Sequence, residues 1–143
     1  MACGRGRLGG TEVKEVLLDT HVWIWLAVEQ LDRFSAKAKK ALRNAERKWI
    51  SAISLWEVAK LVEKKRLAFS IPLLEWIRRS LIECGISVAH LEPEICVESC
   101  SLPGFEQQDP ADQLIVATSR VLSIPLITAD KRIHAFRGVK VIW

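Results

Sequence analysis

The sequence predicts an α/β protein with three layers, an α/β/α sandwich around a parallel sheet of four or five strands. Short apolar runs such as "EVLLD" (residues 15–19) and "IPLIT" (residues 124–128) lack the alternation typical of a strand with one wet face. Segments with helical spacing separate these runs, as in proteins whose parallel strands are joined by helices. A chain of 143 residues, half of them hydrophobic, is long enough to bury one core.

The first half of the chain supplies two of the expected strands. "EVLLD" is the first, within a domain that begins near Val13, and the short apolar helix "HVWIWLAV" (residues 21–28) follows it. "SAKAKKALRNAERKW" (residues 35–49) has alanine, leucine and tryptophan at helical spacing with basic residues on the other face, so we expect a helix reaching Trp49. "WISAIS" (residues 49–54) is the second strand, and "LWEVAKLVEKKRL" (residues 55–67) is the next helix.

The second half continues the alternation of helices and strands. Leu73, Leu74, Ile77 and Leu81 mark a helix that Gly85 stops. A third strand, "ISVAHL" (residues 86–91), and a short helix, "PEICVESCSL" (residues 93–102), come next. "PADQLIVATSRVLS" (residues 110–123) is a helix with proline at its first position. The strand "IPLIT", the short helix "KRIHAF" (residues 131–136) and a last strand "VKVIW" (residues 139–143) complete the series.

Composition limits the function classes. The net charge of +4 and pI near 9.0 favour an anionic partner over a cationic one. No apolar run approaches the roughly 20 residues that cross a bilayer, so we expect no membrane partner. Residues 1–12, which are rich in glycine and lack an apolar signal segment, are interpreted as a flexible N-terminal extension, and residues 13–143 as one domain.

The cysteines indicate a reducing compartment. Cys3, Cys84, Cys96 and Cys100 show no paired spacing, so we expect free thiols in a cytoplasmic protein. A metal site made of Cys96, Cys100 and His90 is the alternative for this group.

Four acidic residues map to the edge of the sheet where parallel strands end. Asp19 ends the first strand, Glu57 lies early in the helix after the second, and Asp112 lies in the first turn of the helix before the fourth. Asp130 follows that fourth strand. Ligands of open α/β sheets bind at this edge. Carboxylate oxygens and water are the ligands that Mg²⁺ and Mn²⁺ prefer, so the four acids are candidate metal ligands.

Each acid also has a structural explanation. "SLWE" reads as a capping box with Ser54 as N-cap, and Asp109 is placed to cap the helix whose third residue is Asp112. Asp19 and Asp130 are likewise placed to cap the helices that follow them. Thr20, Ser54 and Thr128, which lie beside three of the four acids, would orient carboxylates or hold a water in the metal interpretation.

These segments together resemble a known family. "LLDTHVWIW", "SAISLWEVAKL", "DPADQLIVATSRVLSIPLITAD" and "VKVIW" are similar, in this order from Val16 to Trp143, to PIN-domain ribonucleases of the VapC type, the toxins of bacterial VapBC toxin–antitoxin pairs. The resemblance implies a metal-dependent endoribonuclease with Mg²⁺ or Mn²⁺ as cofactor. Its catalytic and metal-binding acids would be Asp19, Glu57, Asp112 and Asp130. Asp109 would be a helix cap and outer partner of the metal ligands.

The resemblance also implies partners: an RNA substrate, a cognate antitoxin protein and a second copy of the chain in a homodimer. Lys131 and Arg132, next to Asp130, are placed to contact RNA phosphates. The chain departs from the family pattern at Gln107 and Gln113, where relatives often carry histidine and arginine. This departure affects substrate positioning more than metal binding. The alternative function is an inactive PIN-like domain that binds RNA or a protein without cutting.

Overall fold

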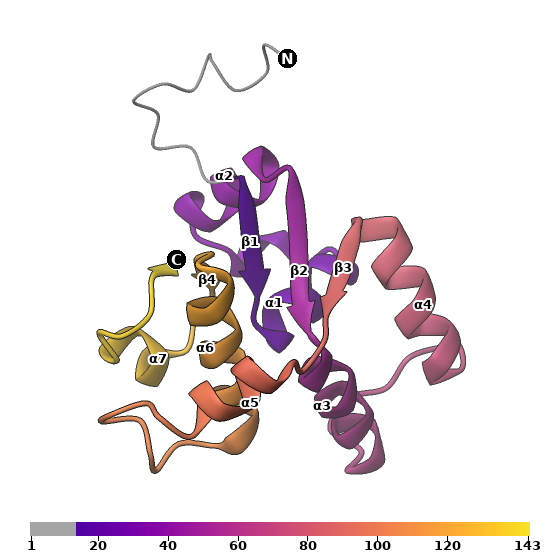
Figure 1. Cartoon of the computed structure of the whole chain (residues 1–143). Coiled ribbons are helices and arrows are strands. Elements are labelled where there is room, and N and C mark those ends of the chain that lie inside the picture. Colours follow the sequence, from indigo (N-terminus) through magenta and orange to yellow (C-terminus); the bar gives the residue numbers. More distant parts are fainter. Residues whose placement is uncertain (1–13) are drawn as a thin grey trace.

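The structure is a computed structural model that describes residues 14–143. Five strands form one parallel sheet in the order β3-β2-β1-β4-β5 (Figure 1). The strands are β1 (Glu15–Leu18), β2 (Arg47–Ser51), β3 (Ile86–Ala89), β4 (Leu126–Ile127) and β5 (Val141–Ile142). The helices are α1 (Thr20–Ala27), α2 (Ala36–Asn44), α3 (Ala52–Glu63), α4 (Leu73–Cys84), α5 (Pro93–Ser99), α6 (Pro110–Leu122) and α7 (Lys131–Ala135), with a short 3₁₀ helix at Leu31–Arg33.

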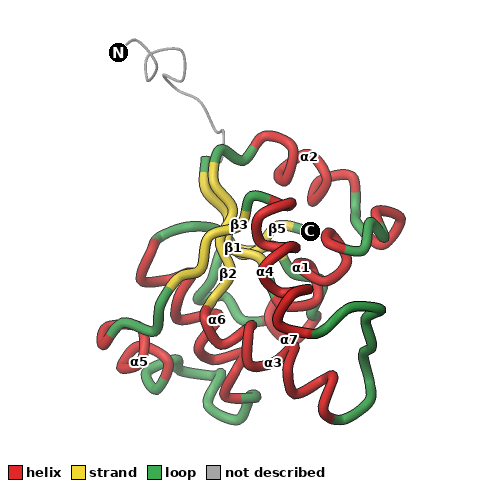
Figure 2. Tube along the Cα trace, turned by 90° about the vertical axis from the view of Figure 1, so that its right-hand side faces the viewer, coloured by secondary structure: helices red, strands yellow, loops and turns green. Residues whose placement is uncertain are grey.

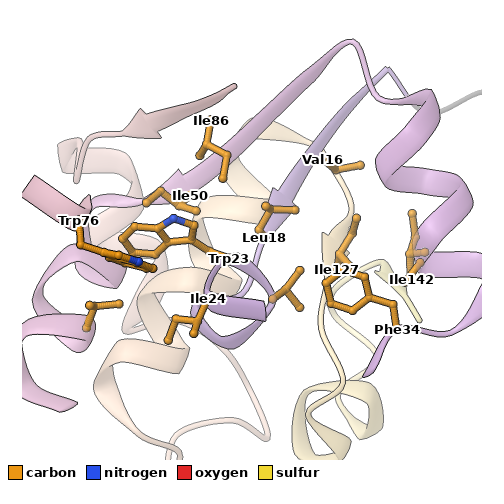
Figure 3. Packing of buried hydrophobic residues seen from close by; sticks show 13 residues of the cluster. Val16, Leu18, Trp23, Ile24, Phe34, Ile50, Trp76, Ile86, Ile127 and Ile142 are labelled. Atoms are coloured by element: carbon orange, nitrogen blue, oxygen red, sulfur yellow. The ribbon is translucent and has the colours of Figure 1, made fainter. Parts of the chain in front are cut away.

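The sheet is the middle one of three layers. Figure 2 shows it nearly edge-on, with α5 and α6 on one side and α1, α2 and α4 on the other. Val16 and Leu18 of β1 pack into the core on the α1 side, where Trp23 is fully buried (Figure 3). Leu17, between them, packs into a second core beneath α6. Because both faces are covered, the strands are apolar throughout, and the predicted α/β/α sandwich is confirmed.

The strand order places the site. The chain moves from β1 to β2 and β3 on one side, then crosses to β4 on the other side of β1. Ligands of open parallel sheets bind beyond the carboxyl ends of the strands where the order reverses. In this protein that point lies between β1 and β4, so Asp19 and Thr128 come into contact although 109 positions separate them.

One helix is shorter than its periodicity predicts. The helix expected to reach Trp49 ends at Asn44, and Arg47–Ser51 forms β2 instead. Ala45 is already extended, and β2 pairs with β1 and β3 over its whole length. Tertiary pairing has overridden a local helical pattern, and Trp49 packs with the core beneath α6 rather than with the stripe of α2.

The predicted capping box at "SLWE" is wrong. Helix α3 begins at Ala52, three residues earlier than expected, and its N-cap is Ser51, whose hydroxyl accepts a hydrogen bond from the backbone N–H of Ile53. Ser54 lies inside the helix and is fully buried. The strand expected to run to Ser54 therefore ends at Ser51, and the Ser54 hydroxyl is left for another role.

Other expectations have mixed outcomes. Gly85 ends α4 in the left-handed conformation, and Pro110 opens α6 behind its cap Asp109, both as predicted. Cys84, Cys96 and Cys100 are free thiols, whereas Cys3 and the extension at residues 1–12 lie outside the described residues. Between residues 14 and 143, no helix has the length and apolar character to cross a membrane.

Candidate metal centre

Asp19 is the innermost acid of the site. Its carboxylate is only 8% exposed at the point where β1 ends and α1 begins. One oxygen accepts a hydrogen bond from the backbone N–H of Thr20 at 2.7 Å, and the other accepts one from the Thr128 hydroxyl at 2.6 Å. Burial raises the pKa of Asp19, while these two hydrogen bonds oppose the rise. The side chain thus caps α1, as expected, and is also held at the carboxyl edge.

Thr20 connects Asp19 to Glu57, through its backbone N–H on one side and its hydroxyl on the other. The Thr20 hydroxyl lies 2.7 Å from the Ser54 hydroxyl and donates a short hydrogen bond to the Glu57 carboxylate. Burial is the largest cause of the raised pKa of Glu57, and the nearby Asp19 adds to it. Ser54 and Glu57 are on one face of α3, so the early start of this helix turns both side chains toward Thr20.

Three carboxylates converge beside these hydroxyls. Oxygens of Glu57, Asp109 and Asp112 all lie within 4.8 Å of one another, close enough to share one cation. Asp109 caps α6 through a 2.8 Å hydrogen bond from the backbone N–H of Ala111, and Asp112 follows in the first turn. No other group of this kind forms among residues 14–143, which leaves the alternative site at His90, Cys96 and Cys100 unsupported.

Burial and this crowding act together on Asp112. Burial raises its pKa to about 7, with further contributions from the charges of Asp19, Asp130, Glu57 and Asp109. A carboxylate behaves in this way when neighbouring negative charges are not compensated. The site therefore favours any cation that brings compensating positive charge.

Asp130 stands apart from this trio and is held by Arg132. It caps α7 through the backbone N–H of Arg132 at 2.8 Å. Burial opposes ionisation of Asp130, but hydrogen bonds from Arg132, including one of 3.0 Å from Nη2, hold its pKa below the ordinary value. The same Nη2 lies 3.4 Å from Asp112. Arg132 therefore bridges two of the predicted acids.

The acid cluster, defined as Asp19, Glu57, Asp109, Asp112 and Asp130, matches the predicted edge, with differences in detail. Asp109 was expected as an outer partner, yet its carboxylate lies within 4.8 Å of those of Glu57 and Asp112. The spacing "DPAD" carried this signal, because residues flanking a helix start lie on one end of the helix. Lys131 is exposed at the start of α7. His21 lines a hollow together with Asp19 and Asp130.

The residues present suit a divalent cation. The donors are carboxylate oxygens and hydroxyls, with no thiolate or imidazole in the trio, a set that fits Mg²⁺ or Mn²⁺ better than softer metals. Among the described residues, every buried side-chain nitrogen or oxygen has a hydrogen-bond partner. The framework around the acids is therefore complete before a cation is added.

Fold and acid cluster together define an α/β protein with a carboxylate-lined site at the carboxyl edge of a parallel sheet. A family model of the PIN domain matches residues 16–139, and the chain belongs to this family. It is 35% identical over 122 residues to Ribonuclease VapC22 of Mycobacterium tuberculosis (strain ATCC 25618 / H37Rv), covering 85% of this chain and 92% of that protein. The resemblance seen in the four sequence segments is thereby confirmed.

Solved structures share the fold at low sequence identity. A chain in the crystal structure of VapBC2 from Rickettsia felis, bound to a DNA fragment from its promoter, superposes with a TM-score of 0.67 at 15% identity, covering 89% of this chain and 96% of that one. A chain of the DNA-bound VapBC from Salmonella typhimurium gives 0.65 at 15% identity, covering 90% and 97%. At these identities the likeness confirms the three-layer fold.

Proposed function

We propose that this protein is a metal-dependent endoribonuclease that acts as the toxin of a toxin–antitoxin pair. The observation that carries the proposal is the convergence of the Glu57, Asp109 and Asp112 carboxylates within 4.8 Å at the carboxyl edge, beside Asp19 and Asp130. The relationship to Ribonuclease VapC22, which extends over most of both chains, supports the choice of RNA as substrate.

The acid cluster would hold Mg²⁺ or Mn²⁺, with Asp19, Glu57, Asp112 and Asp130 as the catalytic and metal-binding residues and Asp109 beside them. A bound cation of this kind neutralises charge on the phosphoryl oxygens and lowers the pKa of water. The protein keeps the acids in place: Thr128 fixes Asp19 and Thr20 fixes Glu57, so neither carboxylate has to reorient when substrate arrives. A carboxylate that touches the attacking water accepts its proton.

Substrate contacts are proposed at the start of α7. Arg132 is exposed, and its guanidinium already lies at the edge of the acid cluster, 3.0 Å from Asp130. Together with Lys131 it offers two cations where a phosphate would approach acids that otherwise repel it. We propose Arg132 and Lys131 as RNA contacts on this ground.

The partners follow from the same site. An antitoxin that blocks it would present a basic side chain to the acids, because a guanidinium can satisfy two carboxylates at once. Arg132 already makes this kind of contact within the chain, to Asp112 and Asp130. In addition to the antitoxin, we propose a second copy of this chain as a partner, in a homodimer. Trp23 and Trp76 are buried in the core and cannot contribute to such an interface, whereas Trp25 is half-buried.

The test is incubation of RNA with purified protein in the presence of Mg²⁺, Mn²⁺ or EDTA, with the Asp112→Asn variant as control. We expect cleavage with divalent metal, none in EDTA and little with the variant. Binding of RNA without cleavage under every condition would mean that the protein is an inactive PIN-like domain. Cleavage by clean protein in EDTA would overturn the metal-dependent mechanism.

A further inference from the structure

A trough leads away from the acid cluster along α1. Two hollows form it, and they share His21 and Trp25 as walls. The smaller, of about 270 Å³, is bounded by Asp19 and Asp130. The larger, of about 560 Å³, extends from His21 and Trp25 to Arg66 and Phe69, in the connection between α3 and α4. The two hollows therefore adjoin each other at His21 and Trp25, beside the acids.

The lining of the larger hollow differs in charge from the acid cluster. None of the described residues that line it is acidic, whereas Arg66, Gln30 and His21 supply polar groups around an apolar floor. The Arg66 side chain forms no hydrogen bond or ion pair with any residue from 14 to 143. A second guanidinium, that of Arg33, contacts two residues that line the hollow. It lies 5.3 Å from the ring centroid of Trp25 and donates a hydrogen bond of 2.8 Å to the Gln30 side chain.

Aromatic rings complete the trough. Trp25 and His21 have ring centroids 6.0 Å apart, and Phe69 is stacked on Trp76 at 3.9 Å, which fixes its ring in place. Fixed rings with nearby cations are the features with which proteins bind unpaired nucleobases, since every base has a face that can stack and a phosphate that follows it. A stack of this kind also tolerates different bases.

We propose that the larger hollow binds an unpaired nucleotide of the RNA substrate, one that adjoins the scissile phosphate. The base lies against Trp25 and Phe69, and Arg66 meets a neighbouring phosphate. This proposal rests on the ribonuclease function proposed above.

The test measures binding separately from cleavage. All proteins carry Asp112→Asn to suppress cutting, and fluorescence anisotropy records the affinity for a labelled single-stranded RNA of about ten nucleotides at fixed salt and Mn²⁺. Arg66→Gln removes the free cation, and Gln30→Glu adds a carboxylate of nearly the same shape that still accepts from Arg33. Arg78→Gln and Asn44→Asp make the same charge changes at exposed positions outside the trough.

We expect both trough variants to weaken RNA binding about fivefold or more, and both controls to change it by less than about twofold. Trough variants that match their controls would overturn the proposal, including the case in which the trough receives a protein partner. Wild-type cleavage is assayed in parallel. If wild type does not cut RNA but the trough variants weaken binding, the nuclease function fails and the nucleotide site stands.

A second measurement locates the base. Where wild type cuts, RNAs with one abasic nucleotide next to the mapped cut are compared on Asp112→Asn protein with and without Arg66→Gln. One abasic position should weaken binding to the parent protein about fivefold or more. The abasic change and the Arg66 change should also be non-additive, because Arg66 meets the phosphate next to that base and both changes loosen the same bound segment. Fully additive losses at every position would place the base elsewhere and overturn the assignment.

Discussion

Asp112 carries part of the electrostatic cost of the site, together with Asp19 and Glu57. Four other carboxylates act on it, and burial with this repulsion brings its pKa to about 7. A buried carboxylate with a raised pKa destabilises the metal-free fold when it is charged, and it is a good ligand for a cation. Asp112 is therefore the residue at which a metal site and a simple helix cap make opposite predictions.

The substitution Asp112→Asn should reduce RNA cleavage about 100-fold or more, because it removes a charged ligand of the proposed cation. In EDTA the variant should melt at the same temperature as wild type or higher, since a repelled charge has gone. Added Mn²⁺ should stabilise the variant clearly less than wild type. Thermal melts of both proteins decide the point. A variant that is less stable in EDTA and responds normally to Mn²⁺ would make Asp112 a helix cap.

The pH dependence of metal-free stability follows from the same pKa. The folded-state pKa of Asp112 is raised to about 7 from an ordinary 3.8, so between these values the folded protein binds more protons than the unfolded chain. Stability from this group is therefore full below about pH 4, is lost as pH rises to about 7, and then levels off. Melts in EDTA should show this fall in wild type and a smaller one in Asp112→Asn. Identical curves would contradict the raised pKa.

At the scale of elements, the site depends on how helices begin. Asp19, Asp109 and Asp130 are the N-caps of α1, α6 and α7, and each accepts a backbone N–H as a cap does. Capping and metal binding are thus compatible, because capping engages one carboxylate oxygen in each of Asp109 and Asp130. A helix start at the carboxyl edge of a parallel sheet turns an ordinary cap into a candidate ligand.

Two substitutions at Asp109 distinguish its role as a helix cap from its proposed role in metal binding. Asparagine caps a helix about as well as aspartate, whereas alanine costs about 0.5–2 kcal/mol of stability. Asp109→Asn should therefore keep the fold as stable as wild type in EDTA and lose part of the Mn²⁺ response, if its carboxylate adds to the site. Asp109→Ala should lose both. Urea unfolding with and without Mn²⁺ measures this. A normal Mn²⁺ response in Asp109→Asn would leave Asp109 as a cap alone.

The helices and strands themselves could be predicted from the sequence more accurately than the residues at which they begin and end. The acids at the carboxyl edge, the parallel sheet and the caps at Asp19, Asp109 and Asp130 could be predicted, because they depend on local pattern and on the order of elements. The start of α3 could not, since Ser51 and Ser54 are both good caps and pairing of β2 with β3 decides between them. The hydrogen bond from Thr20 to Glu57 depends on where α3 begins, so the local sequence pattern could not predict it.

At the scale of the whole molecule, the proposed cation would join α3 and α6, which are far apart in the sequence but in contact in the fold. Since the unfolded chain cannot gather the acids of these helices, metal stabilises the folded state by mass action. At a Mn²⁺ concentration about 100-fold above Kd, the gain is about 2.7 kcal/mol, or roughly 10 °C in melting temperature for a domain of this size. A calorimetric series over Mn²⁺ concentration checks this. A melting temperature independent of Mn²⁺ would exclude a site confined to the folded state.

The contact between Asp19 and Thr128 has a consequence in time as well as in space. A ribosome makes Asp19 early and Thr128 and Asp130 more than a hundred residues later. Until β4 has been synthesised and has paired with β1, the acids of the amino-terminal half lack the acids that the later segments contribute. A chain interrupted anywhere before Asp130 lacks part of the proposed site, so we expect premature termination to yield a product without nuclease activity. Because the chain is synthesised in this order, the nuclease site can be completed only when nearly the whole domain has been made.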